Sequence, residues 1–219
     1  RVVPMLPFQL SNGICSLNPD VDRLTLSCRM DFNAQGIMYD YDIEETVIHS
    51  DMRCTYGKVN EYLEDKTSVP EYAPIGEMLE NFSDLAKAMQ KRTKERGHID
   101  FETKEPYFVL DKNGRPVDIQ VRDRGWSEMM IEEAMIAANV AVAHELHSKN
   151  LPGMFRVHET PDPEKVETIV NMAKALNIPC DINPHDVEPR DIAKFLNSIE
   201  DPDSKEIMST IAVRAMQKA

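Results

Sequence analysis

Residues 21–50 read VDRLTLSCRMDFNAQGIMYDYDIEETVIHS, and this stretch decides the fold class. Over residues 24–32, apolar side chains take every second position and polar side chains take the positions between them. Successive side chains of a strand point to opposite faces, so the alternation predicts a half-buried strand. The sequence Asn-Ala-Gln-Gly at residues 33–36 is typical of a turn. Residues 37–50 are therefore expected to return as the second strand of an antiparallel hairpin.

The flanking sequence carries helical spacing and shorter extended patterns. Helices are expected over residues 55–64, 75–96 and 127–147, and three more are expected to begin near Pro161, Arg190 and Asp203. Extended segments are expected at residues 98–101, 106–111, 117–121 and 154–158, with a loop around Pro70 and Pro74. The helix over residues 127–147 is the most apolar of these and is expected to be central.

Strands thus dominate about residues 1–122 and helices about residues 123–219. This order predicts an α+β fold in which antiparallel β-sheet strands pack against several helices. A chain of 219 residues has room for one large domain or two small ones. We expect one partial domain over residues 1–219 and no complete second domain.

Composition narrows the class of protein. A hydrophobic fraction of 42% and a charged fraction of 29% are typical of a globular chain. No apolar run approaches the roughly 18 residues that span a membrane, so no membrane partner is expected. The four cysteines are widely spaced, which predicts reduced, buried thiols in a cytoplasmic protein. The net charge of −13 argues against a nucleic-acid surface spread over the chain, because polyanions bind clustered Lys and Arg.

The sequence His144-Glu145-Leu146-His147 is similar to the zinc-protease pattern HExxH but has the spacing HExH. The protease pattern places two imidazoles on one helical face, with the glutamate free to act as a base. Here the rings lie three residues apart and no third ligand is evident. We expect a solvated helix end and no metal ligand in this chain.

Two acidic residues and two aromatic residues each allow two interpretations. Glu132 and Glu133 either face solvent near the start of an apolar helix, or one of them points into a polar site. Asn139, seven residues after Glu132, lies on the same helical face and favours the second interpretation slightly. Tyr56 and Phe101 fit a core by their pattern, although exposed aromatic rings also stack on RNA bases.

Several blocks of sequence, taken in order, resemble the catalytic (RNB) domain of the ribonuclease R and ribonuclease II family of exoribonucleases. They are VPMLP at 3–7, LSNGICSLNP at 10–19, VDRL at 21–24, RG at 96–97, IEEAMIAAN at 131–139, FRVHE at 155–159 and RAMQKA at 214–219. Asn18-Pro19 and EPRD at 188–191 are closer to the ribonuclease R branch. The blocks span nearly the whole chain.

The resemblance implies a hydrolase that degrades single-stranded RNA processively from its 3′ end and releases nucleoside 5′-monophosphates, with magnesium activating water. It implies that Glu132 and Tyr56 are catalytic-site residues that also contact the RNA. It implies that Phe101 stacks on the bases of the 3′ end, although the match at this position requires a gap.

The resemblance also implies that the magnesium-binding aspartates precede Arg1 and that the catalytic arginine follows Ala219. The apolar start and the apolar helical stripe at the end favour an internal fragment. Such a fragment is expected to be inactive alone and to self-associate through exposed strand edges. The rival interpretations are a catalytically dead RNA-binding or scaffold protein with this fold, and a protein-interaction domain without any RNA partner.

Overall fold

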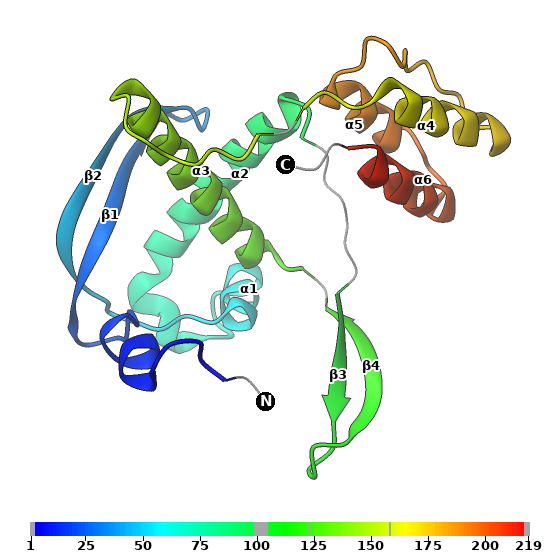
Figure 1. The fold of residues 1–219 in the computed structure, drawn as a ribbon. Coiled ribbons are helices and arrows are strands. Elements are labelled where there is room, and N and C mark those ends of the chain that lie inside the picture. The colour runs from blue at the N-terminus through cyan, green and yellow to red at the C-terminus, as the bar shows by residue number, and fades with distance from the viewer. Residues whose placement is uncertain (1–2, 99–104, 123, 158, 217–219) are drawn as a thin grey trace. The chain divides into compact units, whose positions relative to one another are not determined.

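The computed structural model describes residues 3–98, 105–122, 124–157 and 159–216 (Figure 1). The chain divides into two compact units. The first contains Arg1–Met89 and Arg124–Pro152, and the second contains Gln90–Asp123 and Gly153–Ala219. Two small antiparallel sheets occur together with several helices, which confirms the predicted α+β class. The expectation of one partial domain over residues 1–219 stays a prediction.

The first unit contains the predicted hairpin, made of β1 (Asp22–Phe32) and β2 (Met38–His49). Gly36 in its turn has a positive φ of 70°, a conformation that favours glycine. A Cβ at Gly36 would lie 2.7 Å from the carbonyl carbon of Ala88 in α2 (Gly76–Glu95). The turn therefore packs directly on the backbone of α2.

The apolar face of this hairpin is less buried than the sequence predicts. Leu24 and Leu26 are 87% and 75% exposed, and Val47, opposite Leu24, is 63% exposed. At the turn end of the same face, Tyr41 contacts α3 (Trp126–Ser148) through hydrogen bonds to its last turns. The half-buried prediction is wrong for the outer half of β1, because α3 covers only the turn end of this face. Self-association through the hairpin stays a prediction.

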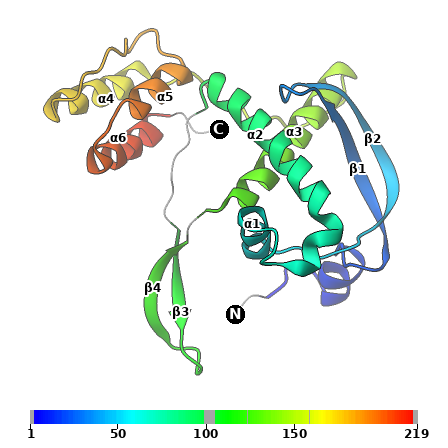
Figure 2. The same cartoon turned by 180° about the vertical axis from the view of Figure 1, so that it is seen from behind.

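The core of the first unit is formed by side chains from three elements. They are α1 (Tyr56–Glu64), the 3-10 helix η2 (Pro70–Ile75) with the residue before it, and the start of α2. Where the sequence predicted a loop around Pro70 and Pro74, the chain forms η2. The buried cluster consists of Val59, Tyr62, Val69, Tyr72 and Leu79. Figure 2 shows α2 and α3 between α1 and the hairpin. Helix α3 contacts α1 and both strands.

Helix α3 is less central than its composition predicts. Met130 and Ala141 are buried, but Met135 and Val140 are 61% and 51% exposed. Apolar residues are spread around the helix, and its main contacts among the described residues are with α1 and the hairpin. Among the described residues, no helix is long and apolar enough to cross a membrane.

The second unit contains a hairpin and a cluster of three helices. The hairpin pairs β3 (Glu105–Leu110) with β4 (Pro116–Arg122), and the helices are α4 (Pro163–Ala175), α5 (Pro189–Asn197) and α6 (Pro202–Ala215). Asp162 and Asp201 cap α4 and α6 by accepting backbone hydrogen bonds. Ile169, Ile192 and Met208 are fully buried between these helices.

Two further details of the fold differ from the sequence predictions. Residues 154–157 form no strand, because they have no pairing partner among the described residues. The π-helix η1 (Gln9–Ile14) was not predicted, and none of its residues is buried.

The prediction of buried thiols is also wrong. Cys15 and Cys54 are exposed, Cys28 and Cys180 are half-buried, and all four are free.

A titratable pair lies at the outer end of the first hairpin. Asp22 Oδ1 accepts a hydrogen bond from His49 Nδ1 at 2.7 Å. This bond, together with the charges of Asp51 and Asp20, raises the pKa of His49 above its ordinary value. The stability that the pair contributes is therefore complete below about pH 6.5 and is lost as the pH rises through the folded-state pKa.

We expect Asp22→Asn to lower the pKa of His49, because the hydrogen bond to a carboxylate is lost. The measurement is an NMR titration of the His49 Cε1 proton in both proteins, with the His185 resonance as the internal control. An identical titration of His49 in the two proteins would contradict this assignment.

Candidate functional site

The starts of α1 and α3 meet in the first unit. The Oγ of Ser127 donates a hydrogen bond to the carbonyl oxygen of Tyr56 at 3.1 Å, across 71 residues of sequence. The backbone N–H of Ser127 donates to Asn60 Oδ1 at 2.8 Å. The fold thereby joins the helix that begins with Tyr56 to the helix that carries Glu132.

Tyr56 is the first residue of α1 and is 43% exposed. The interpretation of Tyr56 as a core residue is therefore wrong. The residue precedes Val59, the first buried position of the helix, so its ring lies outside the core. An exposed ring on a fixed helix start can stack on a nucleobase.

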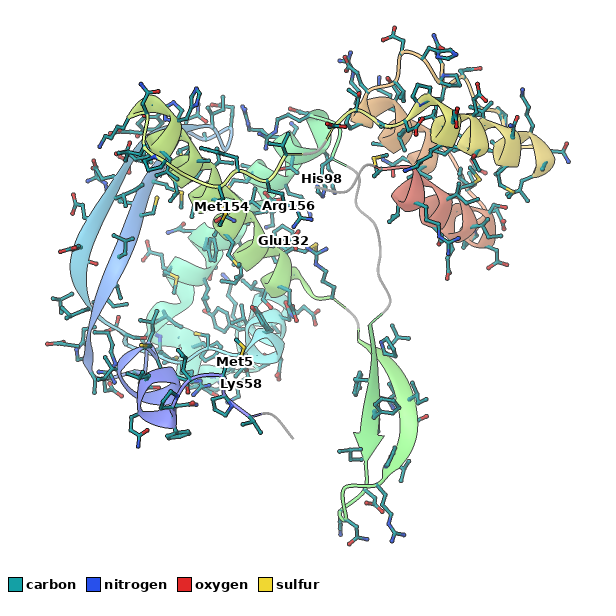
Figure 3. All side chains as sticks on the ribbon, viewed as in Figure 1. Met5, Lys58, His98, Glu132, Met154 and Arg156 are labelled. Atoms are coloured by element: carbon teal, nitrogen blue, oxygen red, sulfur yellow. The ribbon has the colours of Figure 1, made fainter. Side chains whose placement is uncertain are left out.

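Glu132 lies in the second turn of α3 (Figure 3). Its side chain is 45% exposed. It forms an ion pair with Arg124, whose side chain is 43% exposed. The adjacent Glu133 is 9% exposed and lies on the covered side of the helix. Of the two adjacent acidic residues, Glu132 is thus partly exposed and Glu133 is buried. Asn139, which lies on the same helical face as Glu132, is exposed.

A polar row leads from α1 to Glu132. Asn60 Nδ2 donates a hydrogen bond to Glu128 Oε2 at 3.3 Å, and Ser127 Oγ lies 3.1 Å from the same oxygen. Glu128 precedes Glu132 by four residues, so the two carboxylates lie on one face of α3. Glu132 therefore lies one turn beyond this hydrogen-bonded group on the same face of α3, and its carboxylate pairs with Arg124.

Lys58, the cationic residue of α1, forms an ion pair with Glu71. Lys58 Nζ donates a hydrogen bond to Glu71 Oε1 at 2.7 Å, and this bond raises the pKa of Lys58. The same bond lowers the pKa of Glu71. Both groups are thus charged over the whole neutral range.

Phe101, the third predicted site residue, lies outside the described residues. A metal would need a cluster of His, Cys, Asp or Glu side chains, and no group of three suited to a metal gathers in the described ranges. None of the described residues is therefore assigned as a metal ligand.

The HExH segment has a structural role at the C-terminal end of α3. The Tyr41 hydroxyl donates to Glu145 Oε2 at 3.0 Å and lies 2.8 Å from His144 Nδ1. Glu145 also pairs with Lys149, and these bonds lower the pKa of Glu145. His144 and Glu145 therefore attach the hairpin to the helix.

A cavity of about 480 Å³ borders Asn60 on the side of α2. Trp126 and Ser83 line it, and Trp126 Nε1 donates a hydrogen bond to Ser83 Oγ at 2.8 Å. This bond fixes the first residue of α3 to α2, separately from the contact between α3 and α1.

Sequence reasoning missed Asn60, Ser127 and Glu128. Ser127 stood at the predicted start of a helix, which was the available signal. Asn60 carried none, because its partners are 67 and 68 residues away.

Comparison with known proteins adds the family. The RNB domain family matches residues 1–219. The chain belongs to the RNB domain family. Ribonuclease R of Thermotoga maritima is 41% identical over 219 residues, which cover all of this chain and 31% of that protein. This RNB domain chain therefore spans about a third of the length of that relative.

Solved structures resemble this RNB domain chain over its whole length. Mycoplasma genitalium RNase R in complex with ribose-methylated single-stranded RNA has a TM-score of 0.90 and 32% identity, covering 100% of this chain and 34% of that one. Yeast Ssd1, a pseudonuclease, has a TM-score of 0.68 at 17% identity, covering 97% of this chain and 25% of that one, and shares the fold alone.

Proposed function

We propose that the chain is part of a 3′–5′ exoribonuclease that hydrolyses single-stranded RNA processively to nucleoside 5′-monophosphates in the cytoplasm. The observation that carries the proposal is the match, with a TM-score of 0.90 over the whole chain, to a ribonuclease R solved with single-stranded RNA. The net charge of −13 agrees with a narrow RNA contact here and a phosphate-binding surface on other parts of the protein.

In this proposal, the described residues form one wall of the pocket for the RNA 3′ end. Tyr56 stacks on or orients the terminal nucleotide, because its ring is exposed on an anchored helix start. Glu132 accepts hydrogen bonds from the terminal ribose hydroxyls, because its carboxylate is half-exposed. Phe101 is proposed to stack on a neighbouring base.

Magnesium would supply the activated water, and its ligands are proposed to lie outside this chain, as the resemblance to the family implies. We therefore expect the 219-residue chain alone to release no monophosphates from an RNA oligonucleotide. The full-length protein is expected to shorten the same oligonucleotide from its 3′ end.

The measurement compares both proteins on 5′-labelled single-stranded RNA with magnesium, and thin-layer chromatography identifies the released nucleotides. Efficient release of monophosphates by the chain alone would overturn the placement of the metal ligands. Binding without any turnover by the full-length protein would instead favour the dead-fold rival.

A further inference from the structure

Neither of the two helix starts at this site is capped by its own side chains. Thr55, the N-cap residue of α1, makes no side-chain capping bond, and Gly125, the N-cap residue of α3, has no side chain to offer. The first N–H groups of a helix lack partners within the helix, so uncapped starts fray. Both starts must therefore be held from outside.

Asn60 caps α3 from the neighbouring helix. Its Oδ1 accepts from the N–H of Ser127, the second residue of α3, which is the bond that an N-cap side chain normally makes. Gly125 leaves the space for this: a Cβ there would lie 2.0 Å from Asn60 Nδ2. Its φ of −83° is available to any residue, so close approach and not backbone strain is what favours glycine here.

Helix α3 in turn anchors the start of α1. Ser127 Oγ lies 3.1 Å from two acceptors, the Tyr56 carbonyl oxygen and Glu128 Oε2, and its bond to Tyr56 joins the two helices. Ser127 is only 3% exposed, so water does not compete for this bond. The N–H of Thr55 donates to the Tyr72 hydroxyl at 3.1 Å on the other side. The position of Tyr56 is thus set by contacts outside its own helix.

We propose that Asn60 and Ser127, with Gly125 leaving room for them, form a positioning clamp that fixes Tyr56 relative to Glu132 for the RNA 3′-terminal nucleotide. The inference rests on the proposed function, since it assigns these residues to the orientation of the same substrate. They act through Tyr56 and α3 and touch no reacting atom. A misplacement of about 1 Å at a reacting centre can slow turnover about 100-fold, so a loose helix start has a measurable effect.

The test uses the full-length protein with three variants and one matched control. Ser127→Ala removes the bond to Tyr56, and Gly125→Ala displaces the Asn60 amide by a second, independent route. Ser127→Thr keeps the hydroxyl and serves as the rescue. The control is Ser83→Ala, because Ser83 is equally buried, at 4%, and also ties α3 to a neighbour, but the neighbour is α2.

Two readouts separate positioning from general loosening. For Ser127→Ala and Gly125→Ala, kcat is expected to fall about 10- to 100-fold with KM nearly unchanged. Ser83→Ala should retain kcat within about twofold, and Ser127→Thr within about threefold. Fluorescence of a 2-aminopurine at the RNA 3′ terminus should be quenched by the parent protein and by Ser83→Ala but not by Ser127→Ala or Gly125→Ala.

A double-mutant cycle links the clamp to Tyr56. If Ser127 acts through Tyr56, then Ser127→Ala causes no further loss of kcat in a Tyr56→Ala background. Additive losses would overturn the proposal, as would an equal loss in Ser83→Ala. If Ser127→Ala folds poorly, Gly125→Ala decides the outcome.

The experiments distinguish failure of the clamp from failure of the proposed role of Tyr56. Loss of activity in Tyr56→Ala, with parent-like kcat and quenching in both clamp variants, would overturn the clamp and leave the proposed function standing. A Tyr56→Ala protein with parent-like kcat and quenching would overturn the proposed role of Tyr56 itself, and the clamp with it.

Discussion

Glu132→Gln in the full-length protein is expected to lower kcat about 100-fold while leaving its thermal stability almost unchanged. The carboxylate is 45% exposed and paired with Arg124, itself 43% exposed. Exposed ion pairs contribute about 0–1 kcal/mol, and glutamine has nearly the helix propensity of glutamate. Loss of this pair should therefore shift Tm by only about 2–4 °C at most. In its proposed role Glu132 accepts hydrogen bonds from the ribose hydroxyls, and turnover is expected to fall because a neutral amide is a weaker acceptor.

Glu133→Gln is the matched control, since it makes the same chemical change one residue further along α3. Glu133 is 9% exposed and has an interaction partner, so its replacement is expected to cost about 1–3 kcal/mol of stability. Its kcat should remain within about threefold of the parent protein. Single-turnover kinetics and thermal unfolding measured by circular dichroism compare the two variants. A large fall in Tm with unchanged kcat for Glu132→Gln would show that Glu132 has a structural role only.

Ile169→Ala is expected to destabilise the helical cluster of α4, α5 and α6 by about 2–5 kcal/mol. Ile169 is 0% exposed and packs in one cluster with Ile192 and Met208, so the substitution removes buried methylene and methyl groups and leaves a cavity. Native-state hydrogen exchange of the backbone amides in α4 measures the local opening free energy directly.

Ile207→Ala, on α6, provides the comparison for the same chemical change. Ile207 is 46% exposed, so its replacement should cost less than about 1 kcal/mol. Equal destabilisation by the two substitutions would contradict the packing described for this cluster. Ile169 and Ile207 belong to the second unit, whereas Tyr56 and Glu132 belong to the first. The two substitutions therefore test the fold independently of the site.

Much of the fold could be predicted because its signals are local. The alternation in β1 and the turn at Gly36 gave the first hairpin, and the helical spacing gave α1 and α3 to within one residue at each start. The burial of these elements could not be predicted as well. Leu24 and Met135 lie at apolar positions of regular elements, yet both are largely exposed. An apolar pattern indicates which face can be buried, and only the arrangement of neighbouring elements determines whether it is covered.

The order of elements, the α+β class and the resemblance to the RNB domain, which implies the roles of Tyr56 and Glu132, follow from the amino-acid sequence. The tertiary structure alone decided that Tyr56 is exposed and that Glu132, not Glu133, faces outward. It also decided that Asn60 caps a helix 67 residues away. The physical reason is that side-chain periodicity is encoded within one element, whereas a contact such as that of Ser127 with Tyr56 exists only once two elements pack.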